Sequence, residues 1–309
     1  MGGIMELLYW LENLRTPFGD AVFALLTQLG EETVFILIGL LFYWCIHKRA
    51  GFYLLTVGVS GTILNQILKL SFRIPRPWQR DPNFTIVESA REAAKGYSFP
   101  SGHTQTAVGS LGGVARWVKA KWLRVVCIIL CALVAFSRMY LGVHTPWDVG
   151  ISIVIGVLLV FGLYPLMRKA CDNPRILRWV MLGLAAFSLG YVAYVNLATF
   201  PTDTDLASLQ GGIKNAYTML GCAMGLWFSF EIEERFIRFD TKAIWWIQVL
   251  KLALGLVPLL LIKSLTKAPL HALFQGHLFA DAIRYFLITI FAGCLWPITF
   301  KWFGKLEKK

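Results

Sequence analysis

The sequence predicts an all-α fold, namely a polytopic bundle of transmembrane helices. Of the 309 residues, 57% are hydrophobic and 16% are charged, whereas charged residues make up about 25% of a typical soluble domain. The mean hydropathy is +0.60. Several apolar runs reach the roughly 17 to 25 residues that a membrane-spanning helix needs. Only short connections can join these runs in a chain of this length, so one membrane-embedded domain is the simplest interpretation.

The N-terminal stretch differs from the rest because polar residues interrupt each of its apolar patches. Glu6, Glu12, Arg15 and Asp20 divide residues 4–28 in this way. The pattern favours a pair of interfacial amphipathic helices over a span. About nine spans can be placed after it, at residues 32–47, 51–72, 101–118, 122–142, 147–167, 177–198, 213–230, 243–264 and 282–304.

Most basic residues lie in alternate connections between the expected spans. The positive-inside rule places these connections in the cytoplasm, and with them the C-terminus. The net charge of +12 is mostly this orientation signal. It does not form the exposed basic face that nucleic-acid binding requires, so no nucleic-acid partner is expected. The residues concerned are Lys48, Arg49, Arg116, Lys119, Lys121, Arg124, Arg168, Lys169, Arg175, Arg178, Arg235, Arg238, Lys242, Lys301, Lys305, Lys308 and Lys309.

Three polar segments lie on the opposite, outer side, and the first ends the span at residues 51–72. Pro75 lacks a backbone donor and clashes with the preceding turn, so the helix should end near Arg73 and leave Arg76 on an irregular bend. Lys69 then lies in the last helical turn and faces the outer side. A basic helix end whose lysine reaches the interface explains the same residues when they are taken alone.

The second segment opens the span at residues 101–118 with Ser101, Gly102 and His103. Serine is a good helix N-cap, and glycine allows a ligand to approach the backbone closely. The amides of a helix start bind anions, so the segment suits a phosphate group. A capped helix start with an incidental histidine is the alternative.

The third segment places ionisable residues around a predicted helix start. Thr145 fits the N-cap and Asp148 the N3 position of a capping box. His144 directly precedes the cap, so Asp148 can orient its ring, and an oriented histidine acts as a nucleophile or base. Gly142 lets the chain turn between this helix and Arg138 at the end of the preceding span. Asp148 also has a purely structural role available, in the capping box.

The expected topology returns the chain to the same membrane face at all three segments. Three cations, two histidines and one carboxylate then converge. Such a cluster neutralises the nonbridging oxygens of a phosphoryl group. No acidic cluster suited to Mg²⁺ occurs in these segments, so the cations should replace a metal, and we expect no cofactor. The six cysteines lie in or beside apolar runs, which favours small apolar side chains over zinc ligands or disulfides.

The spacing of these residues resembles the full three-part signature of the type 2 phosphatidic acid phosphatase (PAP2) superfamily, in its integral membrane lipid phosphatase branch. The resemblance covers residues 69–148, about a quarter of the chain, and no position departs from the signature. The matching residues are Lys69, Arg76, Pro100, Ser101, Gly102, His103, Ser137, Arg138, His144 and Asp148.

The resemblance implies a role for each of these residues. A histidine that matches His144 attacks phosphorus, and one that matches His103 protonates the leaving group. The chemistry of the residues agrees if Asp148 fixes the tautomer of His144, which then forms a phosphohistidine that water hydrolyses. The residues expected to hold the phosphate are Lys69, Arg76, Ser101, Gly102 and Arg138.

The residue pattern and the extent of the signature together divide the chain into three expected regions. Residues 1–30 form the interfacial segment, residues 31–170 a PAP2-like catalytic core of about five to six helices, and residues 171–309 a transmembrane extension packed on the core. The active site would lie on the outer face of the plasma or inner membrane. Gly221 and Gly225 are spaced for close helix packing, either within the chain or in a homodimer.

A site at the membrane boundary suits an amphiphile whose phosphate lies at headgroup level. We therefore expect metal-independent hydrolysis of a lipid phosphomonoester or diphosphate of the phosphatidate, phosphatidylglycerol phosphate or isoprenoid diphosphate type. The resemblance also allows sphingoid phosphates and soluble phosphate esters. A lipid phosphotransferase and a transporter or flippase of a phosphorylated lipid are the alternatives.

Overall fold

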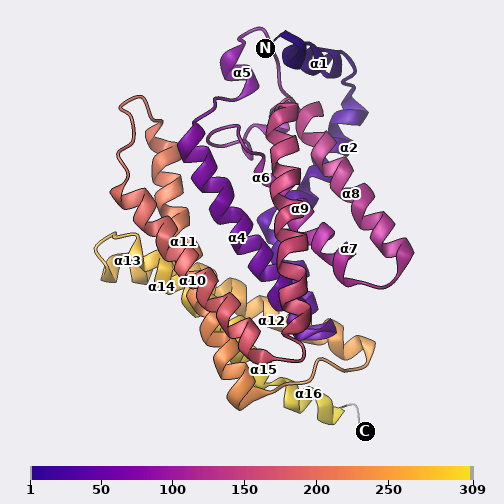
Figure 1. Ribbon diagram of the computed structural model, residues 1–309, viewed down its shortest axis with the longest axis vertical. Coiled ribbons are helices and arrows are strands. Elements are labelled where there is room, and N and C mark those ends of the chain that lie inside the picture. Colours follow the sequence, from indigo (N-terminus) through magenta and orange to yellow (C-terminus); the bar gives the residue numbers. More distant parts are fainter. Residues whose placement is uncertain (1, 307–309) are drawn as a thin grey trace. The chain divides into compact units, whose positions relative to one another are not determined.

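The computed structural model describes residues 2–306, and every regular element in that range is a helix (Figure 1). The predicted all-α fold is therefore confirmed. Lys308 and Lys309, which contribute to the predicted orientation, lie outside the described residues.

The described residues contain six helices that are long and apolar enough to cross a membrane. A seventh crossing results if Pro17–Gly30 and Glu32–Ile46, which are bent by 51° at their junction, are counted as one broken span. The expected spans at residues 32–47, 101–118 and 213–230 are not among the six, so the expected count of nine is not confirmed. The six are Lys48–Arg80, Lys121–Tyr140, Pro146–Lys169, Pro174–Leu197, Trp245–Leu273 and Phe279–Phe303.

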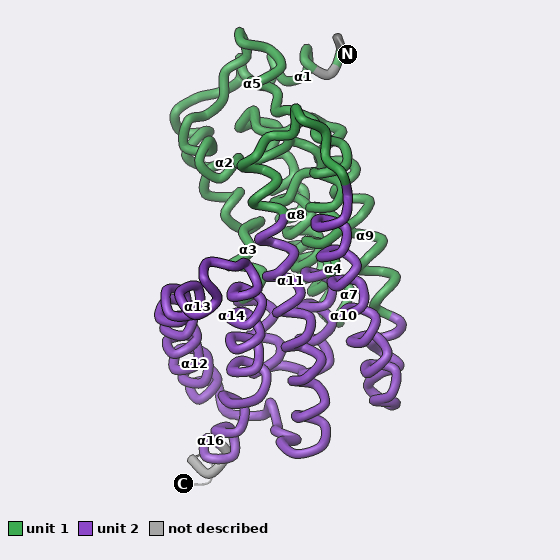
Figure 2. Tube along the Cα trace, turned by 90° about the vertical axis from the view of Figure 1, so that its left-hand side faces the viewer, with its two compact units in different colours: residues 1–36, 60–164, 199–212 green, residues 37–59, 165–198, 213–309 purple. Residues whose placement is uncertain are grey.

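The chain forms two compact units, which Figure 2 shows in different colours. Unit 1 consists of residues 1–36, 60–164 and 199–212. Unit 2 consists of residues 37–59, 165–198 and 213–309. Every expected site residue belongs to unit 1. The expected division into three consecutive regions stays a prediction.

Unit 1 opens with two short helices, α1 (Gly2–Asn13) and α2 (Pro17–Thr27), in the stretch predicted to form an amphipathic pair. Thr16 caps α2 and accepts a hydrogen bond of 3.1 Å from the Gly19 amide. The other elements that lie wholly or partly in unit 1 are η1 (Gln28–Gly30), α3 (Glu32–Leu41), α4 (Lys48–Phe72), α5 (Pro77–Arg80), η3 (Glu88–Ala90), α6 (Gly102–Ala107), the π-helical η4 (Val108–Gly112), α7 (Gly113–Trp117), α8 (Lys121–Tyr140), α9 (Pro146–Lys169) and the start of α11 (Leu206–Ile232).

The first polar segment breaks the helix where the prolines predict. α4 ends at Phe72, and Arg73 adopts a left-handed backbone conformation with φ of 47°. Arg76 follows in extended conformation as the N-cap of α5. The first two cations of the site are therefore Lys69, in the last turn of α4, and Arg76, which follows the sharp turn at Arg73.

Unit 2 contains α11 packed closely on α14 (Phe279–Ile290). A Cβ added to Gly221 would lie 2.2 Å from the carbonyl oxygen of Ala282, and one added to Gly225 would lie 2.6 Å from Cβ of Thr289. The glycine pair thus serves close packing within the chain, one of its two expected uses. Parts of α3, α4 and α9 also belong to unit 2. Its remaining elements are the π-helical η2 (Phe42–Ile46), α10 (Pro174–Leu197), the π-helical η5 (Glu233–Ile237), α12 (Trp245–Leu265), α13 (Lys267–Leu273), the π-helical η6 (Phe291–Leu295), α15 (Trp296–Ile298) and α16 (Phe300–Leu306).

Candidate active site

The three polar segments come together in unit 1. Nη1 of Arg76, at the start of α5, lies 3.0 Å from Nε2 of His144, which directly precedes the cap of α9. The Ser101 amide, at the start of α6, donates to the carbonyl oxygen of Asp148 at 3.1 Å. All four residues are buried. Direct contacts therefore join segments that are more than 40 residues apart in the sequence.

The contacts of His144 indicate which ring nitrogen carries its proton. A guanidinium can only donate, so Nε2 of His144 accepts from Arg76 and the proton of the neutral ring lies on Nδ1. Nδ1 faces Oγ of Ser98 at 3.5 Å and Oδ2 of Asp148 at 3.7 Å. Burial lowers the pKa of His144 well below its ordinary value, and the positive charge of Arg76 lowers it further. The imidazole is therefore neutral at pH 7.

Asp148 closes the expected capping box of α9 with Thr145. The Thr145 amide donates to Oδ2 of Asp148 at 2.7 Å, and the Asp148 amide donates to Oγ1 of Thr145 at 3.3 Å. Ser98 Oγ donates to the same Oδ2 at 2.6 Å. The 3.7 Å from Oδ2 to the ring of His144 exceeds a hydrogen-bond length. Ser98 and the cap therefore hold the carboxylate beside the ring.

Two of the three cations bind backbone carbonyl groups in the connection between α5 and α6. Nε of Arg76 donates to the Gly96 oxygen at 3.0 Å, and Nη2 donates to the Lys95 oxygen at 2.9 Å. Nζ of Lys69 donates to the Tyr97 oxygen at 2.5 Å. A phosphate that binds Lys69 and Arg76 therefore has to replace or share these carbonyl contacts.

Arg138, in the last turn of α8, is fully buried, and only some of its hydrogen-bond donors have a partner. Its Nη1 donates to Oγ1 of Thr27, at the end of α2, at 2.6 Å. Its Nε and Nη2 have no hydrogen-bond partner among the described residues. Buried charged donors without partners are costly, and an anion that accepts both N–H groups removes this cost. Arg138 is thus the cation with open donors at the site.

The start of α6 has the predicted cap. Oγ of Ser101 accepts from the Thr104 amide at 3.5 Å. The Ser101 amide already donates to Asp148, so this part of the predicted anion site is engaged. A Cβ added to Gly102 would meet no described atom closer than Oδ1 of Asn65, at 3.9 Å. Packing within the chain therefore does not require glycine at position 102, and its expected contact with a phosphate group stays a prediction.

His103 has a carboxylate partner that was not expected from the sequence. Its Nε2 lies 3.0 Å from Oε1 of Glu31. Glu31 stands between η1 and α3, at the bend of the broken helix pair. Each histidine of the site thus has a carboxylate near one ring nitrogen.

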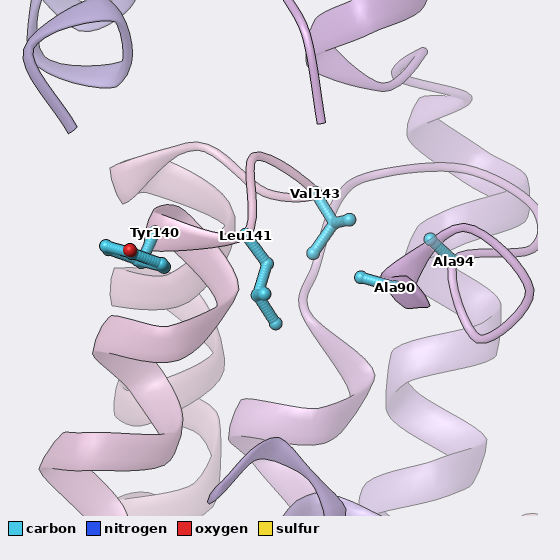
Figure 3. Packing of buried hydrophobic residues seen from close by; sticks show 5 residues of the cluster. All are labelled: Ala90, Ala94, Tyr140, Leu141 and Val143. Carbon is cyan, nitrogen blue, oxygen red and sulfur yellow. The ribbon is translucent and has the colours of Figure 1, made fainter. Parts of the chain in front are cut away.

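The loop before α9 rests on a small hydrophobic cluster, which Figure 3 shows. Tyr140, Leu141 and Val143 are buried there together with Ala90 and Ala94 from the connection after α5. The side chain of Val143 points toward Ala90 (Figure 3). This packing holds the backbone that leads directly to the histidine before α9.

The charge at this site comes from cations of the chain. Lys69, Arg76 and Arg138 lie within electrostatic range of one another. Residues 2–306 contain no group of three or more histidine, cysteine, aspartate or glutamate side chains that could hold a metal ion. None of the six cysteines forms a disulfide.

Three residues that contact the site were not identified from the sequence, namely Thr27, Glu31 and Ser98. Ser98 had a local signal, because it is a polar residue just before the second segment. Thr27 and Glu31 lie far from their partners in the sequence, and a threonine near a helix end or a glutamate at a helix start is ordinary. Only the fold reveals their contacts.

Comparison with known proteins covers most of the chain. Residues 49–172 match the PAP2 superfamily, and residues 217–309 match the PAP2 superfamily phosphatase, transmembrane extension. An undecaprenyl-diphosphatase of Sulfolobus acidocaldarius is 30% identical over 152 residues, which are 48% of this chain and 70% of that protein. The chain belongs to the PAP2 superfamily.

Two further relatives carry phosphatase names. A probable sphingosine-1-phosphate phosphatase of Dictyostelium discoideum is 29% identical over 160 residues, 48% of this chain and 38% of the relative. An undecaprenyl-diphosphatase of Bacillus subtilis is 32% identical over 105 residues, 34% of this chain and 51% of the relative. The matches thus span about half or less of these two relatives. No solved structure matches this PAP2 superfamily member.

Proposed function

We propose that this PAP2 superfamily member is a membrane phosphatase that hydrolyses the phosphomonoester or diphosphate of a lipid and releases inorganic phosphate. Arg138 carries the proposal, because it is a buried guanidinium with two unpartnered nitrogen atoms. Nearby, His144 presents a neutral imidazole whose Nε2 is an acceptor. This arrangement suits a tetrahedral anion bound next to a nucleophile.

In the first half-reaction, Nε2 of His144 attacks phosphorus while the bond from phosphorus to the leaving oxygen breaks. The entering phosphate takes over the N–H of Arg76 that Nε2 accepts in the resting structure. Asp148, near Nδ1, stabilises the positive charge that develops on the ring as the N–P bond forms. Lys69 and Arg138 neutralise the nonbridging oxygens as charge is redistributed.

His103 supplies the proton for the leaving oxygen, which departs as an alcohol or, from a diphosphate, as a monophosphate. Water then attacks the phosphohistidine and gives its proton to His103, and the N–P bond to His144 breaks. Inorganic phosphate leaves, and both histidines regain their starting protonation. Water is therefore the only co-reactant, and no step needs a metal ion.

The membrane setting supports a lipid as the substrate. Arg138 lies two residues before the end of α8, and Asp148 lies two residues after the start of α9. Both helices are candidate spans. A phosphate bound at such helix ends lies near the headgroups while its hydrocarbon chain stays in the bilayer. The relatives named for sphingosine-1-phosphate and for undecaprenyl diphosphate support both a monophosphate and a diphosphate substrate.

The proposed site faces the outer side of the membrane. Lys48 and Arg49 begin α4 and Lys69 lies in its last turn, and under the positive-inside rule this distribution supports an extracytoplasmic site. Asn83→Cys, at an exposed position after α5, should react with a membrane-impermeant thiol reagent on intact cells. Cys171, which is exposed just after α9, should react only after the cells are opened. The reverse pattern would contradict this orientation.

The deciding experiment measures phosphate release by the purified protein from a lipid monophosphate, a lipid diphosphate and glucose 6-phosphate, with and without EDTA. We expect release from a lipid substrate, no inhibition by EDTA, and loss of activity in His144→Ala. A labelled phosphohistidine should be trapped in the wild type and absent from that variant. Activity near wild type in His144→Ala would rule out the mechanism.

The same experiment separates the alternatives. A phosphotransferase would accumulate a phosphorylated acceptor in place of free phosphate. A transporter would move the labelled lipid across a vesicle membrane without forming a phosphohistidine.

A further inference from the structure

The contact between His103 and Glu31 joins the site to a part of the chain outside the matched PAP2 region. That region begins at residue 49, whereas Glu31 lies between η1 and α3. Oε1 of Glu31 is 3.0 Å from Nε2 of His103. The side chain of His103 is 14% exposed and that of Glu31 is 36% exposed, so water reaches this contact mainly from the side of Glu31.

A second observation shows that this bend is fitted to the site. A Cβ added to Gly30 would lie 2.7 Å from the carbonyl oxygen of His103 and 2.9 Å from its Cβ. Glycine at position 30 therefore lets the bend approach the start of α6 closely. Thr27, one turn earlier, binds Nη1 of Arg138. The bend thus contacts both the histidine and the cation with open donors.

We propose that Glu31 is a positioning residue for His103 in the reaction of this enzyme. The inference rests on the proposed phosphatase function. Glu31 accepts a hydrogen bond from the Nε2–H group of His103. This bond fixes the ring plane and leaves Nδ1 as the nitrogen that reaches the leaving oxygen.

Burial lowers the pKa of His103, and Glu31 opposes this shift by favouring the protonated form, which a general acid needs. The charged groups that act on this ring are Glu31, Arg138 and Arg76, and only Glu31 among them is negative. When the P–O bond breaks, the proton on Nδ1 moves to the leaving oxygen and Glu31 keeps its charge. In the second half-reaction, the proton from water returns to Nδ1. Glu31 therefore supports His103 much as Asp148 supports His144.

The test compares two substrates that differ in their need for a general acid. Departure of an alkoxide from a long-chain alkyl phosphate needs a proton, whereas p-nitrophenolate leaves without one. We expect Glu31→Gln to lower kcat/KM for the alkyl phosphate by about tenfold to hundredfold, and for p-nitrophenyl phosphate by much less. Glu31→Ala should lower kcat/KM for the alkyl phosphate more than Glu31→Gln does, because glutamine can still accept a hydrogen bond from the ring. The alkaline limb of the pH profile should move to lower pH in Glu31→Gln.

Two further variants keep the result interpretable. Glu6→Gln removes an exposed carboxylate of α1 and should leave both substrates unaffected. Adding Glu31→Ala to His103→Ala should cause no further loss, because Glu31 acts through that histidine. Equal losses with both substrates, or a further loss in the double variant, would overturn the inference. If the wild type releases no phosphate, the proposed function fails; if the wild type is active and Glu31→Gln is unchanged, only the role of Glu31 fails.

Discussion

Ser98 donates a hydrogen bond of 2.6 Å to Asp148 and places its hydroxyl beside the ring of His144. Oγ of Ser98 is 3.5 Å from Nδ1 of that ring, closer than the carboxylate oxygen at 3.7 Å. All three side chains are buried, so water does not screen their interaction. The carboxylate is thus oriented by the segment that precedes α6 as well as by its own helix cap.

Ser98→Ala should lower kcat by about tenfold to hundredfold. Loss of one hydrogen bond to a buried carboxylate costs roughly 1.5 to 3 kcal/mol. A barrier higher by about 1.4 kcal/mol lowers the rate tenfold. The matched control is Ser110→Ala, because Ser110 is also a buried serine of unit 1 and donates to the Thr106 oxygen at 2.8 Å. Steady-state kinetics of both variants with the lipid substrate check the prediction. Equal kcat values for Ser98→Ala and wild type would show that the bond to Asp148 is only structural.

Arg138→Lys should lower kcat/KM by about a hundredfold. Lysine keeps the charge but cannot present two N–H groups in the planar arrangement that a phosphate accepts. Arg124→Lys, at the exposed start of the same helix, should have no effect and controls for the exchange itself. Titration of both variants with inorganic phosphate measures how much of the loss in kcat/KM comes from weaker phosphate binding. Unchanged phosphate affinity in Arg138→Lys would contradict the role of its open donors.

Activity should persist to unusually low pH on the acid side of the profile. The nucleophile is the neutral ring of His144, whose pKa is lowered first by burial and then by Arg76. The ordinary histidine pKa is about 6.5, so protonation of His144 should reduce kcat/KM only well below that pH. Arg76→Gln removes a positive charge and should move this limb to higher pH. Nitrogen-15 chemical shifts of the His144 ring, followed in the absence of substrate, separate its titration from that of the phosphate.

Local rules explain what could be predicted from the sequence. Pro75 stops α4, Ser101 caps α6, and Thr145 with Asp148 closes a capping box, because each of these effects depends on residues within one turn. The fixed spacing of the three segments then indicated the family, which the comparisons confirm. Helical periodicity and apolar length were enough for the all-α fold.

Contacts between distant segments explain what could not be predicted. Glu31 and His103 are 72 residues apart, and no pattern in either segment points to the other. Pro17–Gly30 and Glu32–Ile46 can form one broken span, bent at their junction. The sequence predicted an interfacial helix pair followed by a separate span. The carbonyl groups that bind Arg76 also belong to an irregular connection, whose backbone path no periodicity describes. Tertiary packing decides all three features.

Gly142→Ala should destabilise unit 1 and reduce activity together. Gly142 has a φ of +79°, where an alanine costs roughly 1 to 2 kcal/mol. An added Cβ would also lie 2.6 Å from Nη2 of Arg15 and 3.1 Å from Cε1 of Phe84, so either the turn or these side chains must shift. Because the turn joins α8 to the loop of His144, a shift moves the nucleophile away from Arg138.

Thermal unfolding in detergent and phosphate release together check this prediction for Gly142→Ala. A lower Tm and a lower kcat are expected in the same variant. Gly162→Ala is the matched control, because a Cβ at that position of α9 meets no described atom within 4 Å. It should retain the Tm and the activity of the wild type. An unchanged Tm in Gly142→Ala would mean that the left-handed turn is not needed to hold His144 in place.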